Sequence, residues 1–319
     1  MVFTESMLNG YSQPLSETED QRCKRAINMV RDALRNIGYS TPATAPDILV
    51  ADSYAYTYEM RNAAGKKVRL LVQGSYANNT NVKQNSDVDI AVILESTFET
   101  NYRPGVTGER YGFTDSSETA LSFKDAVEKI LRDYFVTGVE RKNKSIKVHG
   151  NSYRVDADTV PCLRYRDYRN DYRFDPDNYT GGIVIHADDG AKIYNYPEQH
   201  IRNGKVKNAA TNHIYKKMVR IMKKMRYLME DCDISAASKV SSFALESLLW
   251  NIPDSWYLEY KDFRKVFVFN QLISYLHAHV GEMPGYLEAN GIKKLFPTAR
   301  DVENMNSFLN ALNRFYQYQ

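Results

Sequence analysis

The sequence is poor in the residues that build disulfide frameworks and metal clusters. Among its 319 residues are only three cysteines, Cys23, Cys162 and Cys232. They are scattered, odd in number and without the spacing of a zinc site, so we expect reduced thiols in a cytoplasmic protein. The histidines are also too dispersed for a metal cluster. The dispersed histidines include His149, His186, His200 and His213.

Long apolar runs and a strong charge of one sign are missing as well. No stretch approaches the roughly 18–20 apolar residues of a membrane span, and residues 1–14 lack the apolar region of a secretory signal, so we expect no membrane association. The net charge of +3 gives no strong nucleic-acid-binding signal. Repeats and low-complexity tracts are absent. A composition of 43% hydrophobic and 25% charged residues is that of a globular protein with a sizeable core.

The order of the apolar patterns divides the chain into two parts. Residues 17–38 predict a long amphipathic helix, since Ser16 and Glu19 have the spacing of a capping box and Gly38 can end it. Strands and hairpins are mixed with helix up to about residue 195, whereas helices dominate afterwards. The change of pattern near residue 205 predicts an α+β domain over 1–205 and a helical domain over 206–319.

The individual elements follow from the same periodicities. We expect strands at 68–72, 87–94, 144–149, 152–161, 182–185 and 192–194. We expect helices at 118–135, 209–230, 240–251, 262–279 and 301–317. Residues 97–116 are rich in Thr, Gly and Asn and predict a loop.

The most informative feature is a Gly-Ser turn followed by two acidic residues on an apolar strand. Gly74-Ser75 follows one strand, and Asp87 and Asp89 stand two positions apart in the next, 87–94. Side chains at i and i+2 point to the same side of a strand. Two carboxylates placed in this way suit a pair of divalent cations that bind the attacking and leaving oxygens of an in-line displacement. The pattern therefore predicts transfer of a nucleotidyl group from a nucleoside triphosphate.

Two neighbouring features complete this hypothesis. A third carboxylate is needed to complete the metal coordination, and Asp156 and Asp158, which share one side of the strand 152–161, are both candidates. The missing side chain of Gly74 lets a phosphate approach the backbone, and Ser75 offers a hydroxyl beside it. The residues alone leave Asp156 and Asp158 open.

Together these motifs resemble a known superfamily. Gly74-Ser75, Asp87-x-Asp89 and Asp158-Thr159-Val160-Pro161 are similar to the motifs of the polymerase-β-type nucleotidyltransferases. More narrowly they resemble the cGAS/DncV-like nucleotidyltransferases (CD-NTases) of bacterial antiphage signalling and their relatives, the oligoadenylate synthases. In those families the third aspartate lies three residues before a proline, which selects Asp158. The resemblance covers roughly residues 15–255.

The resemblance implies a role for each site residue. Asp87 and Asp89 are expected to bind two Mg²⁺ ions, which Mn²⁺ can replace, and Asp158 the catalytic one of the two. Ser75, Lys223 and Ser242 are expected to hold the triphosphate of the donor nucleotide. Two structural alternatives stay open: a solvated charged face for Lys223, which shares a helix face with Lys216 and Arg220, and a helix cap for Ser242.

The resemblance also implies the fold and the reaction. We expect a polymerase-β-like core with a mixed sheet, a C-terminal helical lobe, an active site in the cleft between them, and a helix 17–38 that spans both lobes. Nucleoside triphosphates, ATP among them, are expected to be joined into a cyclic di- or trinucleotide with release of pyrophosphate. This product is expected to act on a separate effector protein in antiphage defence.

Three other functions compete with cyclic nucleotide synthesis. A relative in the same superfamily makes linear oligo- or polyadenylate or modifies tRNA ends, and another adenylylates a protein. A catalytically inactive nucleotide- or RNA-binding module is the third. The complete set of Asp87, Asp89 and Asp158 argues against an inactive module.

Overall fold

The computed structural model describes residues 2–36, 38–40, 46–49, 53–83 and 87–319. It divides the chain into two compact units. The sheet unit consists of Glu17–Ala77 and Ser86–Glu198, and the helical unit of Met1–Ser16, Asn78–Asn85 and Gln199–Gln319. These units differ from the expected division into 1–205 and 206–319: the N-terminal Met1–Ser16 and the internal Asn78–Asn85 fold with the helices, and the sheet unit ends at Glu198.

The sheet unit is built on a mixed sheet, as expected. Its strands follow the order β10-β9-β8-β5-β4-β3-β2, and the small hairpin β6–β7 is attached to β8 through β7. Neighbouring strands pair antiparallel except β5 and β8, which are parallel. The strands are β2 (Asp47–Ile48), β3 (Tyr56–Arg61), β4 (Lys67–Gln73), β5 (Val88–Asn101), β6 (Val139–Arg141), β7 (Ile146–Val148), β8 (Ala157–Asp167), β9 (Thr180–His186) and β10 (Lys192–Asn195).

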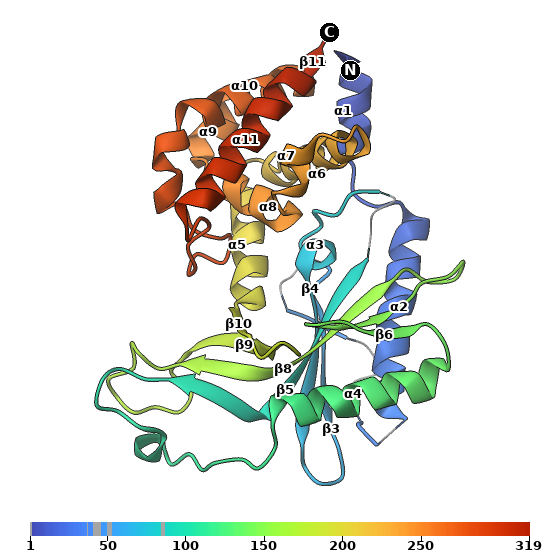
Figure 1. Ribbon diagram of the computed structural model, residues 1–319, viewed down its shortest axis with the longest axis vertical. Helices are drawn as coiled ribbons and strands as arrows, with labels where there is room; N and C mark the ends of the chain where they lie inside the picture. The colour runs from blue at the N-terminus through green and yellow to red at the C-terminus, as the bar shows by residue number, and fades with distance from the viewer. Residues whose placement is uncertain (1, 37, 41–45, 50–52, 84–86) are drawn as a thin grey trace. The chain divides into compact units, whose positions relative to one another are not determined.

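The two faces of this sheet differ. Helices α2 (Glu17–Arg35) and α4 (Ala120–Phe135) pack against β5 and β8 on one face, and Figure 1 shows both helices beside the strands. The other face carries a buried apolar cluster that, among the described residues, includes nothing from α2 or α4. Its buried members are Leu71, Ala91, Ile93, Val160, Cys162, Ile183 and Ile185. The sheet therefore offers one face that these two helices leave uncovered.

The predicted elements of the sheet unit are largely confirmed, with some corrections. The helix expected over 17–38 is α2, which ends at Arg35, and its buried residues include Ala26, Val30 and Leu34. All of α2 belongs to the sheet unit and not to both lobes as expected. The loop expected from 97 begins later, because β5 changes its register on β8 between Leu94 and Phe98 and then pairs as far as Asn101. The hairpin expected around Gly150-Asn151 has a longer connection, since β7 ends at Val148 and β8 begins at Ala157.

The helical unit has its own apolar core and joins the two ends of the chain. Strand β1 (Val2–Phe3) pairs in parallel with β11 (Gln317–Tyr318). Buried methionine, leucine and aromatic side chains fill the space between the helices. The helices are α1 (Glu5–Tyr11), α5 (Pro197–Ala210), α6 (Tyr215–Asp231), α7 (Ser235–Ser238), α8 (Ser242–Trp250), α9 (Asp254–Glu259), α10 (Lys265–Ala278) and α11 (Ala299–Phe315).

One helix was predicted with the wrong start. The pattern over 209–230 belongs to two helices, because α5 ends at Ala210 and α6 begins at Tyr215. Asn212 and His213 between them have φ of 48° and 61°, a left-handed conformation that interrupts an α-helix. Helix α5 itself was not predicted, although Pro197 at its first position is a common start. None of the helices in the described part of the chain is long and apolar enough to cross a membrane.

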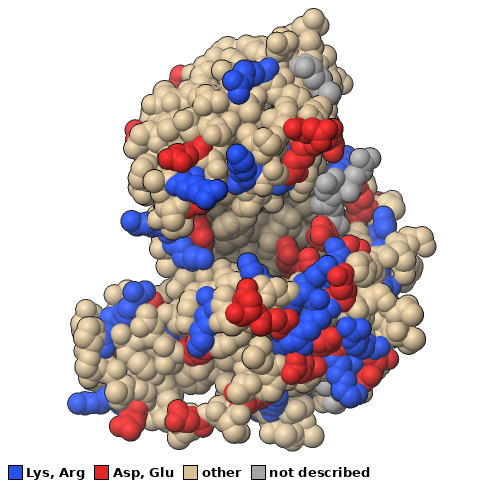
Figure 2. All heavy atoms as spheres, in the orientation of Figure 1, with Lys and Arg blue, Asp and Glu red and all other residues tan. Residues whose placement is uncertain are grey.

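The surface charges of the sheet unit are mixed in sign. On the face shown in Figure 2, basic and acidic side chains lie among one another over this unit. Arg141 is an example, since its guanidinium pairs with Asp125, Glu128 and Asp188. Intermingled charges of both signs fit the small net charge of +3.

Candidate active site

The Gly-Ser turn and the first acidic strand meet within the sheet unit. Strand β4 ends at Gln73, which pairs with Asp89 on β5, and the single turn α3 (Gly74–Ala77) follows directly. Gly74 has a φ of +68°, and a Cβ atom at this position would lie 2.1 Å from Asp89 Oδ2. Only glycine fits here, both for its backbone conformation and for the carboxylate against it. The two motifs are therefore parts of one site.

The third acidic residue lies directly across from Asp89. Strands β5 and β8 run parallel with Asp89 opposite Asp158, at the spacing of about 4.8 Å between neighbouring strands. Because side chains alternate along a strand, Asp89 shares the face of Ala91 and Ile93, and Asp158 that of Val160. Both acids are half-buried on the face opposite α2 and α4, and the exposed Asp87 immediately precedes β5.

The environment of Asp158 is short of positive charge. Burial raises the pKa of its carboxyl, and the nearby Asp87 and Asp156 raise it further, against the lowering effect of Lys147 and Lys142. The carboxylate of Asp158 makes no hydrogen bond or ion pair with any residue that the structure describes. A half-buried carboxylate beside other carboxylates is stabilised by a cation, so Asp158 suits a metal ligand.

Asp156 has a different environment from Asp158. Its Oδ1 accepts a hydrogen bond from the backbone N–H of Gly150 (2.6 Å), and its Oδ2 pairs with Lys147 Nζ (2.6 Å). Burial raises the pKa of Asp156, but Lys147 and the Gly150 N–H outweigh it and hold that pKa below its ordinary value. The carboxylate of Asp156 is thus already neutralised, which favours Asp158 as the third ligand.

The carboxylates fit divalent cations of the magnesium type. Mg²⁺ prefers oxygen ligands, keeps several waters and is bound through one or two carboxylates together with substrate phosphates. Among the residues described, no group of three or more His, Cys, Asp or Glu side chains forms a ready cage for an ion. Asp87, Asp89 and Asp158 are therefore suited to cations that the substrate phosphates help to hold.

The two predicted triphosphate ligands of the helical unit have contrasting surroundings. Ser242 is the first residue of α8 and is half-buried, while the preceding Ser241 is the N-cap, its Oγ accepting from Ala244 N (3.0 Å). The suggestion that Ser242 is only a cap is therefore wrong, because Ser241 has that role. The expected contact of Ser242 with the donor triphosphate stays a prediction.

Lys223 is buried rather than solvated. Only 3% of it is exposed, and its Nζ donates to Glu246 Oε2 (2.6 Å) and to Thr80 Oγ1 (3.0 Å). Lys216 and Arg220 on the same face of α6 are buried too, so the alternative of a solvated charged face is wrong. Its expected contact with the donor triphosphate stays a prediction.

Glu246 and Thr80 were missed by the sequence reasoning. Glu246 lies among the buried Leu245, Leu248 and Leu249 of α8. An acidic residue inside an apolar stripe needs a buried partner, and this signal was present in the sequence.

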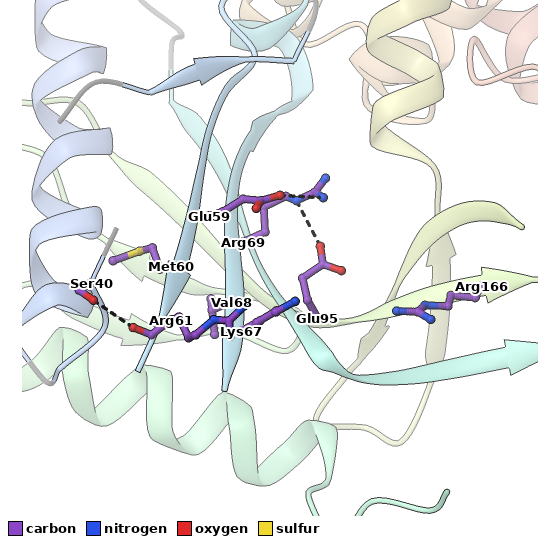
Figure 3. Close-up of a pocket in the computed structure, with 9 residues that line it drawn as sticks. All are labelled: Ser40, Glu59, Met60, Arg61, Lys67, Val68, Arg69, Glu95 and Arg166. Carbon is purple, nitrogen blue, oxygen red and sulfur yellow. Dashed lines mark hydrogen bonds and ion pairs between the residues drawn. The ribbon is translucent and has the colours of Figure 1, made fainter. Parts of the chain in front are cut away.

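A charged pocket lies on the sheet away from Asp89 and Asp158. Figure 3 shows this cavity of about 360 Å³, where Arg69 pairs with Glu59 and Glu95 and Arg166 extends from the neighbouring strand. Glu95 shares the side of β5 with Asp89 but stands six residues further on, about 20 Å at the rise of a strand. The ion pairs of this pocket thus belong to a different place on the sheet from the carboxylates of Asp89 and Asp158.

Comparison with known proteins identifies a family for each of the two units. Residues 59–171 match the nucleotidyltransferase domain family, and residues 202–317 match the cGAS/DncV-like nucleotidyltransferase C-terminal helical domain. The chain is 43% identical over 320 residues to the cyclic GMP-AMP synthase CdnE03 of Staphylococcus schleiferi, covering 100% of this chain and 98% of that protein.

Two solved structures are similar over nearly the whole chain. One is the CdnE cyclic dinucleotide synthase of Elizabethkingia meningoseptica with GTP and Apcpp, at a TM-score of 0.73 and 30% identity, covering 98% of each chain. The other is the CdnE c-UMP-AMP synthase of Rhodothermus marinus with Apcpp and Upnpp, at a TM-score of 0.76 and 29% identity, covering 98% of this chain and 95% of that one.

Proposed function

We propose a specific reaction for this chain, which belongs to the cGAS/DncV-like nucleotidyltransferase family and is a nucleotidyltransferase that makes cyclic dinucleotides: one ATP and one GTP are joined into cyclic GMP-AMP. A ribose hydroxyl of one nucleotide attacks the α-phosphate of the other, a new P–O bond forms and pyrophosphate leaves. A second attack of the same kind closes the ring and releases a second pyrophosphate. The choice of ATP and GTP rests on the relative from Staphylococcus schleiferi, which is 43% identical over the full length.

One observation carries the proposal. Asp89 and Asp158 face each other on neighbouring strands, and Asp89 lies against the Gly74 turn. Bound divalent cations supply neutralisation of the phosphates and activation of the attacking hydroxyl, and the family is generally metal-dependent. Asp87 and Asp89 hold both cations, Asp158 holds the catalytic one, and Ser75 contacts a phosphate of the donor. Lys223 and Ser242 are the proposed triphosphate contacts from the helical unit.

The product identifies the reaction. The protein is incubated with ATP, GTP, CTP and UTP, singly and in every pair, with Mg²⁺ or Mn²⁺, and the products are treated with phosphatase and analysed by mass spectrometry. We expect a phosphatase-resistant product with the mass of cyclic GMP-AMP from the ATP and GTP pair. A resistant product of other bases overturns the choice of nucleotides.

Other outcomes overturn the reaction itself. A linear product that phosphatase degrades identifies an oligonucleotide synthase, and label from radioactive ATP on protein identifies an adenylylating enzyme. No product with any nucleotide or metal identifies an inactive binding module.

We also propose that the product acts on a separate effector protein in antiphage defence. This step rests on the family alone. The measurement is the plating efficiency of phage on the native host carrying either the normal gene or the double change Asp87→Asn and Asp89→Asn. We expect higher plating on the altered strain, and equal plating contradicts a role in defence.

A further inference from the structure

A short buried segment connects the two motifs of the acidic site. Residues 78–83, called the connector here, follow α3 with its Ser75 and lead toward Asp87, four residues beyond Lys83. The connector folds with the helical unit although the elements on either side belong to the sheet unit. Asn78 and Thr80 are fully buried and Asn81 is 3% exposed. The chain therefore runs through the helical unit between its phosphate turn and its metal ligands.

Buried charges of α6 and α8 hold the middle of the connector. Thr80 Oγ1 donates to Glu246 Oε2 (2.7 Å) and accepts from Lys223 Nζ (3.0 Å), while Lys223 Nζ also donates to Glu246 Oε2 (2.6 Å). The three groups form a closed triangle of hydrogen bonds, and Glu246 is only 1% exposed. The Thr80 hydroxyl is therefore fixed in one position between the ammonium of Lys223 and the carboxylate of Glu246.

Further contacts fix the start of the connector. Asn78 Nδ2 donates to His200 Nδ1 (3.3 Å), and His200 Nε2 donates in turn to Glu246 Oε1 (2.9 Å). Arg220 Nη1 donates to the backbone oxygen of Asn79 (2.6 Å). The two carboxylate oxygens of Glu246 thus hold two residues of the connector. Oε1 is linked to Asn78 through His200, and Oε2 accepts directly from Thr80.

The stability of the helical unit does not by itself require this network. Replacing a buried ion pair by apolar side chains of similar volume is often neutral or stabilising, so an apolar contact would hold the helices together equally well. Directional hydrogen bonds to Asn78, Asn79 and Thr80 add a defined position for the connector. On the side of the phosphate turn, only Tyr76 and Ala77 of α3 separate Ser75 from Asn78, so the position of the connector passes directly to Ser75.

We propose that Glu246 and Lys223 are positioning residues for nucleotidyl transfer: through Thr80 they hold the connector so that Ser75 keeps its reactive position. The inference rests on the proposed function, because it uses nucleotidyl transfer as its readout. Misplacement of reacting groups by about 1 Å costs as much as 100-fold in rate. Loosening the connector should therefore lower kcat more than it changes substrate binding.

The test removes the hydroxyl and leaves the ion pair intact. Thr80→Val keeps the shape of the side chain and the Lys223–Glu246 pair. We expect a fall in kcat of about 10- to 100-fold with the KM for each nucleotide changed by less than about twofold. Thr80→Ser, which restores the hydroxyl, should recover most of the activity.

Thr211→Val is the matched control. Thr211 is another fully buried threonine of the helical unit, and its Oγ1 donates to the backbone oxygen of Lys207 (2.8 Å) outside the connector. We expect it to lose a comparable amount of thermal stability and to keep the kcat of the wild type. Equal effects of the two valine variants on kcat overturn the proposal, because they indicate a general loss of stability.

A double variant separates the positioning role of Lys223 from direct binding of phosphate by its side chain. Replacing both Lys223 and Glu246 by Met removes the ion pair without leaving a buried charge. We expect kcat to fall as in Thr80→Val. A rise in the nucleotide KM with kcat preserved, together with a silent Thr80→Val, overturns the positioning role and leaves Lys223 with only the triphosphate contact proposed above. If the wild-type protein forms no product at all, it is the proposed function that fails.

Discussion

The two units of this protein use charged side chains in opposite ways. In the helical unit Glu246 is fully buried, yet the attraction of Lys223 and His200 outweighs the effect of burial and holds its pKa below the ordinary value. In the sheet unit Asp158 is only half-buried, but burial and neighbouring carboxylates raise its pKa. A buried charge with its partner in place is part of the architecture. Crowded carboxylates whose neighbouring lysines do not outweigh burial and mutual repulsion fit a bound cation. This contrast can be tested by substitutions in both units.

The largest effect should come from the pair of acids before and at the start of β5. Asp87→Asn with Asp89→Asn removes two proposed metal-binding carboxylates and several kcal/mol of transition-state stabilisation, on the order of 10³-fold in rate. Product formation is measured by mass spectrometry and folding by thermal denaturation. Asp115→Asn, an exposed acid of the same unit, is the control and should be fully active. Turnover retained in the double variant contradicts the site.

The next effect separates the two candidates for the third carboxylate. Asp158→Asn should lower kcat by about 100-fold or more, since it removes a proposed ligand of the catalytic cation. Asp156→Asn should have a much smaller effect, because Asp156 is engaged with Lys147 and Gly150. Rates at saturating Mg²⁺ are the measurement. An active Asp158→Asn together with an inactive Asp156→Asn means that the assignment is reversed.

The helical unit should respond in stability. Lys223→Met leaves Glu246 buried without its cation and should lower the free energy of unfolding by about 3–5 kcal/mol. The control is Lys207→Met, since Lys207 is also buried but its partner Asp254 is 47% exposed and can hydrate. Urea unfolding measures both variants. Equal losses contradict the view that the burial of Glu246 makes the difference.

The smallest expected effect is on the pH dependence of stability, where Glu246 and Asp158 should act with opposite signs. The lowered pKa of Glu246 means that its contribution to stability is complete above the ordinary carboxyl value of about 4.3 and is lost as the pH falls through the lowered pKa. The raised pKa of Asp158 means that its ionisation destabilises the metal-free fold at higher pH, a penalty that disappears on acidification.

The two acids should therefore change the acid response in opposite directions. In EDTA, Glu246→Gln should weaken the loss of stability on acidification, whereas Asp158→Asn should make that loss steeper. Urea unfolding at several pH values, from neutral to well below the ordinary carboxyl pKa of about 4.3, measures the slopes. Slopes that change in the same direction contradict the comparison.

Much of the sheet unit was predictable because its signals are local. The continuous apolar run of 87–94 correctly predicted a strand after the Gly74-Ser75 turn, and the apolar stripe of 17–38 correctly predicted α2. The errors arose where long-range pairing decides. Strand β5 continues to Asn101 because β8 supplies hydrogen bonds beyond a change of register. The break between α5 and α6 depends on left-handed Asn212 and His213, residue types that adopt this conformation only in some contexts.

The sequence by itself determined the chemistry: the types and spacing of Gly74, Ser75, Asp87, Asp89 and Asp158 predict nucleotidyl transfer, because strand geometry places side chains by position alone. Only the tertiary structure decided which groups lie next to each charged side chain. It brought Lys223 of α6, Glu246 of α8 and Thr80 of the connector into one network, and it gave Asp156 a lysine that Asp158 lacks. The physical reason is that the energy of a charge depends on its burial and its partners, and these come from distant parts of the chain.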